Sequence, residues 1–266
     1  MKRIRILLFA TATAAITLGT TITVCYNHYT PPRLRSPFPI TQTNYDTLRV
    51  VYIGDSWAAM HNGYDCQLQQ TLEDNLQLPV KVISAGFPGK TSKQIYECLF
   101  DDEMLHGLIS KGCHFCFISA GINDTYQKMS TKYYKQSMDG IIQLLLANDI
   151  HPIILEIPDY DIIKAYCHQK TSRQWVRRFS MLVTCTQIDC KQAFRDTLRE
   201  LIHEKNLQDS ITLISYKSWN NDYINDLRLL YIGDGMHLNQ RGYEKLDSCI
   251  AQYIIFIVQQ SRPASQ

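Results

Sequence analysis

The serine that follows the first apolar run of the chain stands where a nucleophile is expected. Ser56 ends the string Gly54-Asp55-Ser56, which comes directly after the run 48–53 and before a predicted helix. A serine at such a turn lies at the carboxyl end of a strand, and the N–H groups that open the helix favour an oxyanion beside it. A string this short also arises by chance, and serine is a common helix cap. Ser56 therefore needs partners elsewhere in the chain.

A candidate base and its partner stand near the other end of the sequence. Asp234 precedes His237 by three residues, in the stretch before the last amphipathic segment. A serine hydroxyl is a weak nucleophile until a base accepts its proton, which His237 can do while Asp234 fixes the imidazole tautomer. Without Ser56, the same two residues would be interpreted as a turn-capping aspartate and a surface histidine. The three residues together predict a serine hydrolase.

Two further loops contain residues that can stabilise a tetrahedral intermediate. Gly89 follows the second apolar run, and its N–H can approach a substrate oxygen because the residue has no side chain. Asn123 follows the third run, and its amide can donate to the same oxygen. Glycine turns and Asn-Asp pairs are also ordinary loop residues. The prediction of a serine hydrolase therefore depends on the four segments taken together and in this order. Each of them follows a predicted strand or precedes the last predicted helix.

The elements that must position these residues alternate between short apolar runs and amphipathic stretches. Five runs are predicted as strands, at 48–53, 80–83, 115–120, 152–157 and 211–214. The strongest helical patterns span 133–147 and 175–207. Such alternation predicts a parallel sheet between helical layers. Two less regular segments, 158–180 and 216–230, are predicted as loops that contact substrate or only cap the sheet.

With these motifs in place, residues 48–258 resemble the SGNH, or GDSL-like, hydrolases. The family is named for Ser, Gly, Asn and His in four blocks, which are matched here by Gly54-Asp55-Ser56, Gly89, Gly121-Ile-Asn123-Asp124 and Asp234-x-x-His237. The resemblance implies an α/β fold, a three-layer α/β/α sandwich with a flavodoxin-like, mainly parallel sheet. It also implies no metal ion and no organic cofactor.

The same resemblance assigns roles to the residues. Ser56 becomes the nucleophile, His237 the general base and Asp234 the residue that orients it. The N–H of Ser56 joins Gly89 and Asn123 in the oxyanion hole. The chain departs from the family pattern at Trp57, where leucine is common, and at Ser84, where the second block often has asparagine. Gly86 is a rival to Gly89 for the oxyanion position.

The first residues are typical of a targeting segment. Basic residues at positions 2, 3 and 5 precede the stretch 6–24, which has no charged side chain and is near the ~20 residues that a helix needs to span a bilayer. Residues 1–27 are predicted as a signal-anchor, with a cleaved signal peptide or a buried helix as alternatives. The positive-inside rule then places the remaining chain outside the cytoplasm, membrane-anchored, or secreted or periplasmic after cleavage. Proline-rich residues 28–46 are predicted as an extended linker, and residues 47–266 as the hydrolase domain.

Charge and cysteine content limit the partners. The chain has 27 Lys+Arg against 25 Asp+Glu, so it lacks the basic excess that binding to nucleic acid requires. The nine cysteines do not reveal a pairing, although Cys185 and Cys190 are close in sequence. Cys113 and Cys116 run into an apolar strand, which favours buried free cysteines over a metal or redox site.

These observations predict an exported serine esterase acting on an acylated small molecule or carbohydrate. O-acetyl groups on cell-envelope or dietary polysaccharide are the preferred substrates. A lipase or thioesterase, a sugar O-acyltransferase and a non-catalytic glycan-binding domain are the alternatives. Aromatic residues could stack on sugar rings, although aromatics are more often core residues. They are Trp57, Tyr160, Tyr216, Trp219 and Tyr223.

Overall fold

The computed structural model describes residues 13, 17, 19–21, 23–40, 46–64, 67–220 and 222–261, and for residue 261 the backbone alone. The elements of the domain follow one another in this order: β1 (Leu48–Gly54), α2 (Ser56–His61), α3 (Gln67–Leu76), β2 (Val80–Gly86), α4 (Ser92–Asp101), α5 (Glu103–Ser110), β3 (Phe115–Ser119), α6 (Ile122–Gln127), α7 (Thr131–Leu146), β4 (His151–Leu155), α8 (Ile162–Cys167), α9 (Thr171–Thr184), α10 (Lys191–Glu204), β5 (Thr212–Ile214), α11 (Tyr216–Trp219), α12 (Tyr223–Leu230) and α13 (Gln240–Ser261).

The five strands form one parallel sheet in the order β2-β1-β3-β4-β5. This is the strand order of flavodoxin-like folds, whose ligands bind beyond the carboxyl ends of the strands where the order reverses. Here the reversal lies at β1, between β2 and β3, so the residues that follow these three strands meet at one edge. The predicted α/β/α sandwich with a flavodoxin-like parallel sheet is confirmed.

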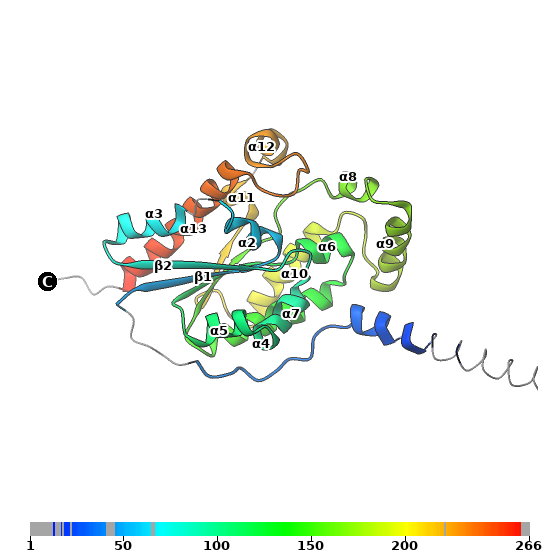
Figure 1. The fold of residues 1–266 in the computed structure, drawn as a ribbon, viewed down its shortest axis with the longest axis horizontal. Helices are drawn as coiled ribbons and strands as arrows, with labels where there is room; N and C mark the ends of the chain where they lie inside the picture. Colours follow the sequence, from blue (N-terminus) through cyan, green and yellow to red (C-terminus); the bar gives the residue numbers. More distant parts are fainter. Residues whose placement is uncertain are drawn as a thin grey trace, which may run out of the picture.

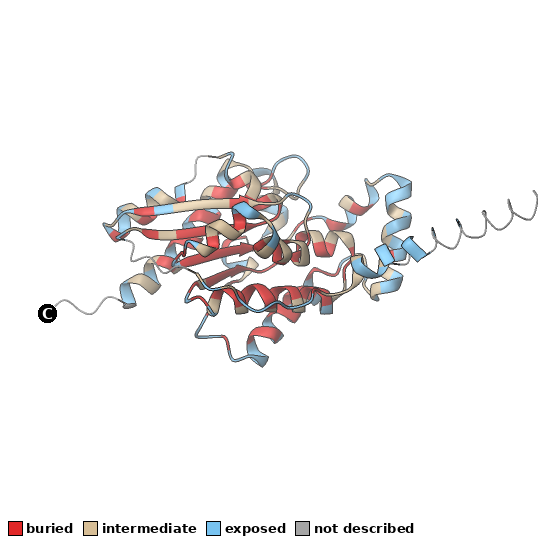
Figure 2. Cartoon of the chain, turned by 60° about the horizontal axis from the view of Figure 1, so that its bottom comes forward, coloured by how far each residue is buried: buried red, intermediate tan, exposed pale blue. Residues whose placement is uncertain are grey.

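Helices cover both faces of the sheet. Figure 1 shows α2, α3 and α13 on one face and α4, α5, α7 and α10 on the other. The strands are apolar nearly throughout because both faces are covered, and every residue of β3 is buried. Figure 2 shows the same distribution, with buried residues on the strands and on the helix surfaces that face them.

The segment before β1 lies against the domain. Residues 31–40 contain no helix or strand and run along the layer of α4 and α7. The backbone N–H of Arg35 donates to the Tyr96 hydroxyl (2.7 Å), and its guanidinium forms a bidentate ion pair with Asp101 (2.6 and 2.9 Å). Phe38 packs edge-on against Phe100, with ring centroids 5.4 Å apart. Residues 31–40 of the predicted linker are thus bound to the domain surface, whereas residues 28–29 belong to the helix before them.

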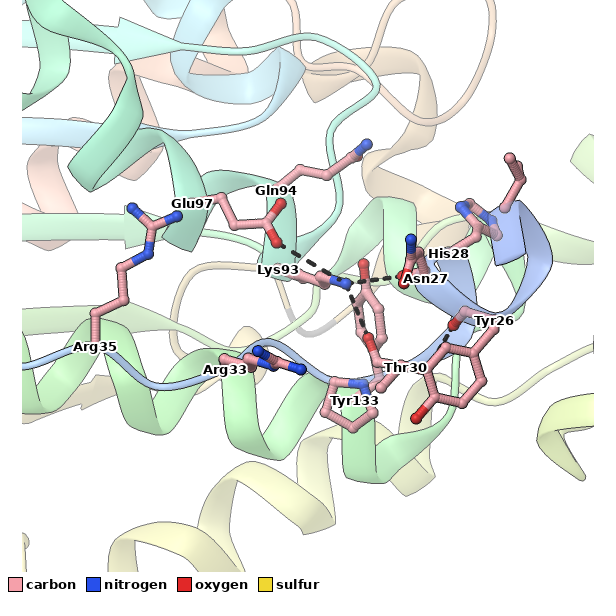
Figure 3. Close-up of a pocket in the computed structure, with 12 residues that line it drawn as sticks. Tyr26, Asn27, His28, Thr30, Arg33, Arg35, Lys93, Gln94, Glu97 and Tyr133 are labelled. Atoms are coloured by element: carbon pink, nitrogen blue, oxygen red, sulfur yellow. Dashed lines mark hydrogen bonds and ion pairs between the residues drawn. The ribbon is translucent and has the colours of Figure 1, made fainter. Parts of the chain in front are cut away.

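The helical residues before this segment, 23–29, are also tied to the domain. The ammonium group of Lys93 donates to the carbonyl oxygens of Asn27 (2.8 Å) and Thr30 (3.0 Å), as Figure 3 shows. The Tyr29 hydroxyl lies 2.5 Å from the hydroxyl of Ser180 on α9. The predicted signal-anchor, residues 1–27, lies largely outside the described residues. Among the residues that are described, no helix has both the length and the apolar character of a bilayer span.

Two predictions of local structure are wrong. The segments 158–180 and 216–230 were predicted as loops, yet they contain α8, most of α9, α11 and α12. Their polar residues cap helices: the Asp161 carboxylate accepts from the N–H of Lys164 (2.8 Å), and Asp222 accepts from Asn225 (3.2 Å). The helix predicted over 175–207 is also interrupted, because Cys185 ends α9 in a left-handed conformation (φ 55°) and α10 begins only at Lys191.

Candidate functional site

The turn between β1 and α2 places Ser56 at the sheet's carboxyl edge. Gly54 is the last residue of β1. A Cβ at this position would lie 2.3 Å from the carbonyl oxygen of Ser119 on β3, so a side chain does not fit there. Ser56 is the first residue of α2, and at that position its N–H has no acceptor within the helix. Both the hydroxyl and the N–H of Ser56 are therefore at the start of a helix, next to an open cavity.

Asp55, which lies between Gly54 and Ser56, is fully buried and caps α2. Its carboxylate accepts from the backbone N–H of Trp57 (3.0 Å) and from the side-chain amide of Asn123 (3.3 Å). Burial raises the pKa of Asp55 to about 7, and these hydrogen bonds only partly oppose the shift. The cap fixes the turn that presents Ser56.

The loop before α13 brings the predicted base to the serine. His237 Nε2 lies 2.9 Å from Ser56 Oγ, and His237 Nδ1 lies 2.5 Å from Asp234 Oδ2. The other carboxylate oxygen of Asp234 accepts from the backbone N–H groups of Met236 (2.9 Å) and His237 (3.0 Å). Partial burial raises the pKa of Asp234, but these hydrogen bonds outweigh it and the pKa lies below its usual value. Ser56 is thus joined in one hydrogen-bonded chain to two residues of a loop that lies far from it in sequence.

Two aromatic side chains that the sequence suggested as sugar-stacking residues instead hold this loop in place. The indole N–H of Trp57 donates to the carbonyl oxygen of Met236 (3.2 Å), and the Tyr223 hydroxyl donates to that of Gly235 (2.6 Å). These carbonyl groups belong to the two residues between Asp234 and His237. The two hydrogen bonds therefore fix the spacing of the acid and the base. The only sequence signal was the unusual tryptophan directly after Ser56.

Gly89 and Gly86 differ in their suitability as an oxyanion donor. Gly89 lines the cavity that Ser56 lines, and it has φ of +79°, a conformation that favours glycine. Within the described part of the chain, its N–H donates no hydrogen bond. A Cβ on Gly86 would lie 1.9 Å from the backbone nitrogen of Ala59, so that glycine is needed for packing of β2 against α2. The geometry favours Gly89.

Asn123 lies in the cavity but its amide is already engaged. It donates to the carbonyl oxygen of Lys90 (3.1 Å) as well as to Asp55 (3.3 Å). The sequence predicted a donor aimed at a substrate oxygen, whereas this structure aims both amide hydrogens at protein acceptors. The longer bond, to Asp55, is the weaker of the two by distance. If the bond to Asp55 were broken, one amide hydrogen of Asn123 would be available to a substrate oxygen.

The next residue anchors a neighbouring helix. The buried carboxylate of Asp124 accepts from the backbone N–H of Ser92 (2.8 Å) and from its hydroxyl (2.5 Å), at the first residue of α4. Burial raises the pKa of Asp124 to about 6. This contact joins the turn after β3 to the loop that carries Gly89.

The cavity at Ser56 has a volume of about 910 Å³. Its wall is formed by the Ser56 turn, the loop at Gly89, α6, the His237 loop, and side chains of α8 and α9. Aromatic residues proposed to stack on sugar do not line it. Trp57, Tyr160 and Trp219 are at most 2% exposed, so substrate cannot reach them. Tyr216 and Tyr223 lie outside this wall, which leaves Tyr126 as the one tyrosine or tryptophan among its described residues.

A second set of serine, histidine and aspartate lies inside the domain. His61, at the end of α2, has Nε2 2.8 Å from Asp247 and Nδ1 2.8 Å from the hydroxyl of Ser84. The side chains of His61 and Asp247 are 1% and 2% exposed. The set joins α2, β2 and α13, its base and acid are buried, and none of the three residues lines the cavity at Ser56, so we interpret it as structural.

The cysteines behave as core or surface residues. Cys113 and Cys116 are buried, as predicted, and burial raises the pKa of Cys113 to about 12, which keeps it as a thiol. Cys185 and Cys190 are both free, so the pairing suggested by their spacing is not formed in this structure.

Comparison with solved structures supports the fold. A lipase/acylhydrolase from Enterococcus faecalis matches with a TM-score of 0.54 at 18% identity, covering 82% of this chain and 100% of that one. An acetyl xylan esterase, AlAXEase, matches at 0.55 and 17% identity over 78% and 100% of the two chains. Axe2, an acetylxylan esterase from Geobacillus stearothermophilus, matches at 0.53 and 15% identity over 78% and 94%. At these identities the likeness concerns the fold alone.

Sequence comparison assigns the family. No curated protein sequence matches this chain. The profile of the GDSL-like Lipase/Acylhydrolase family matches residues 52–245, which include Ser56, Gly89, Asn123, Asp234 and His237. The match covers well over half of the chain. The protein therefore belongs to the GDSL-like lipase/acylhydrolase family and is a serine hydrolase that acts on esters.

Proposed function

We propose that the protein is an exported esterase that removes acyl groups, acetyl groups in particular, from a carbohydrate, with Ser56 as nucleophile, His237 as general base and Asp234 as its orienting partner. The observation that carries the proposal is the continuous chain of hydrogen bonds from Asp234 through His237 to Ser56 Oγ (2.5 and 2.9 Å) at the wall of an open cavity. Nucleophile, base and orienting group at such distances are the arrangement that covalent acyl transfer needs.

The reaction proceeds in two halves. Ser56 Oγ attacks the ester carbonyl carbon while its proton passes to His237 Nε2, and the carbonyl oxygen becomes an oxyanion. N–H groups of Ser56 and Gly89 and the amide of Asn123 donate to that oxyanion. The intermediate collapses, the alcohol leaves with the proton from His237, and an acyl-serine remains. A water molecule, deprotonated by His237, then releases the acid and restores Ser56.

The choice of acetylated carbohydrate rests on two supports. Two of the similar folds are acetyl xylan esterases, although at 17% and 15% identity. Most of the residues that line the cavity have polar or charged side chains, which can form hydrogen bonds with a sugar. The exported location rests on the uncharged stretch 6–24 behind basic residues.

A matched pair of variants tests the chemistry. The detergent-solubilised full chain should hydrolyse 4-nitrophenyl acetate, and Ser56→Ala should abolish the activity. Ser248→Ala, at an exposed serine on α13, should leave the activity unchanged. Hydrolysis by Ser56→Ala at the wild-type rate would eliminate the serine mechanism. Preference for long acyl chains over acetate would favour the lipase alternative.

The location is tested separately. The full chain should remain in the membrane fraction after a carbonate wash, and deletion of residues 1–27 should release it. Recovery of a mature chain that begins after residue 24 would instead show a cleaved signal peptide.

A further inference from the structure

One stretch of the sequence is strongly basic although the whole chain is nearly neutral. Between Asp161 and Asp189 there are five Lys or Arg residues and no acidic residue, against 27 and 25 in the entire chain. The five are Lys164, Lys170, Arg173, Arg177 and Arg178. This stretch forms α8 and α9, which Figure 1 shows beyond the end of the sheet that carries α6. We call it the basic arm.

Three of these cations face the cavity of Ser56. Lys164, Lys170 and Arg173 line it together with Ser56 and His237. Among the described residues of the wall, the one acid is Asp234, whose carboxylate is hydrogen-bonded to His237. The cavity therefore has a positive wall opposite the reacting groups, without an acid free to neutralise it.

These three cations have no structural partner. All three side chains are exposed, and none forms an ion pair within the part of the chain that the structure describes. The nearest acid in sequence, Asp161, uses its carboxylate to cap the N–H of Lys164. By contrast, Lys191 and Arg195 of the next helix are buried, and each is paired with an aspartate (3.1 and 2.7 Å).

A second cavity, of about 720 Å³, shows what paired cations look like in this chain. It lies between α4 and residues 24–35, and Figure 3 shows Arg35 and Lys93 at its wall. Arg33 also lines this cavity, and it forms no ion pair with a described residue. Arg35, however, pairs with Asp101, and Lys93 pairs with Glu97 and two backbone carbonyl oxygens. Those two cations hold the N-terminal segment in place. Lys164, Lys170 and Arg173 hold no element of the described fold.

We propose that the ester substrate carries a negative charge, a carboxylate or phosphate near the acyl group, and that Lys164, Lys170 and Arg173 bind it. This inference rests on the proposed esterase function and names its substrate class: an acylated anionic carbohydrate. Several cations converging on one cavity concentrate an anionic ligand there and speed its association, an effect that falls as salt rises. Arginine and lysine at the rim bind both carboxylate and phosphate.

An anionic lipid surface is the competing partner for the basic arm. Helix α9 also exposes Trp175, Val176 and Phe179, and basic residues beside apolar ones suit a lipid interface. The substrate is favoured because Lys164, Lys170 and Arg173 line the same cavity as Ser56. A lipid partner would not require their placement there.

Competitive inhibition tests the proposal without requiring the natural substrate. Hydrolysis of 4-nitrophenyl acetate by the full chain is measured at low ionic strength with trigalacturonate, its uncharged trimethyl ester, or inorganic phosphate as inhibitor. We expect trigalacturonate to inhibit at least tenfold more strongly than the trimethyl ester, with the difference lost at high salt. Inhibition by phosphate alone identifies the phosphate form of the substrate, and inhibition by trigalacturonate the carboxylate form.

Two triple variants locate the binding site. Lys164→Gln/Lys170→Gln/Arg173→Gln should raise the inhibition constant of the anion on the order of tenfold and bring it to that of the neutral ester. Its matched control removes three exposed cations elsewhere: Lys81→Gln/Lys132→Gln/Arg241→Gln, which should leave both constants unchanged. Melting curves of both variants verify that each is folded.

The outcomes separate this inference from the proposed function. A wild-type chain inert towards 4-nitrophenyl acetate refutes the esterase and this inference with it. An active enzyme that is inhibited equally by the charged and the neutral trisaccharide, and is not inhibited by phosphate, overturns the inference alone. So does an anion preference that survives the Lys164/Lys170/Arg173 triple variant. Loss of binding to phosphatidylglycerol vesicles by that variant, with unchanged inhibition constants, would assign the basic arm to the membrane and overturn the substrate proposal.

Discussion

Substituting Asp234 by asparagine separates the chemistry of the His237 loop from its structure. One oxygen of Asp234 accepts from the backbone N–H groups of Met236 (2.9 Å) and His237 (3.0 Å), and the other lies 2.5 Å from His237 Nδ1. Asparagine has the same shape and one oxygen. That oxygen can accept both backbone N–H groups, which leaves the NH₂ group facing the imidazole.

The new donor reverses the imidazole tautomer. An NH₂ group beside Nδ1 requires Nδ1 to accept, so the proton of the neutral ring moves to Nε2. Nε2 lies 2.9 Å from Ser56 Oγ and would then donate to the hydroxyl that it should deprotonate. An orienting aspartate of this kind contributes on the order of ten-thousandfold to kcat, which is about 5 kcal/mol of transition-state stabilisation. We expect a loss of that size for Asp234→Asn, with KM little changed.

Stability should respond differently from turnover. Because both backbone hydrogen bonds remain, Asp234→Asn should melt close to wild type. Asp234→Ala removes all three bonds, and should therefore lower both kcat and the melting temperature. The pKa of Asp234 is lowered in the folded protein. Its charge therefore stabilises the fold above its unfolded pKa, and the contribution is lost as pH falls through the folded pKa.

Steady-state hydrolysis of 4-nitrophenyl acetate, labelling with a fluorophosphonate and melting curves measure these effects. Asp234→Asn with kcat within threefold of wild type would refute the orienting role of Asp234. If Asp234→Asn melted as low as Asp234→Ala, the claim that asparagine preserves the loop would be wrong.

Three further substitutions follow from contacts around the site. Asn123→Ala should lower kcat on the order of a hundred- to a thousandfold with KM little changed; normal kcat with a lower melting temperature would show a purely structural role. Trp57→Phe removes the donor to the Met236 carbonyl, and should cost about 1 kcal/mol in urea unfolding and lower kcat; unchanged kcat would show that the anchor is not needed for catalysis. The pKa of Asp124 is about 6 in the folded protein against 3.8 ordinarily, so the folded state binds more protons than the unfolded one and stability falls as pH rises between these values. Asp124→Asn should flatten that part of the melting-temperature profile, and because the Asp124 charge helps to raise the pKa of Asp55, it should also shift the Asp55 part to lower pH.

The residues at strand ends could be predicted from the sequence because their signal is local. The runs at 48–53 and 115–120 are mostly apolar, and they form β1 and β3 with an error of one residue. A parallel sheet brings the carboxyl ends of its strands to one edge, so Ser56, Gly89 and Asn123 were expected to meet there. The structure places all three at one cavity.

Other features depend on contacts between distant residues and had no local signal. The bond from Trp57 to Met236 joins positions 179 apart, and it buries a side chain that the sequence offered as a sugar platform. The left-handed Cys185 that separates α9 from α10 is not a glycine or asparagine, so nothing in the residue type predicted the break. The engaged amide of Asn123 likewise depends on Asp55 and Lys90, which approach it only in the folded chain.

The two histidines of α2 and the His237 loop show why residue types alone do not define a site. His61 and His237 each lie within 2.9 Å of a serine hydroxyl and an aspartate oxygen. His61 is buried in the core, and neither His61 nor Ser84 lines the cavity that Ser56 and His237 share. His237 is partly exposed, and its serine opens a helix at the carboxyl edge of the sheet, where N–H donors also point. Access and an oxyanion site, not the Ser-His-Asp set, therefore decide which of the two can catalyse acyl transfer.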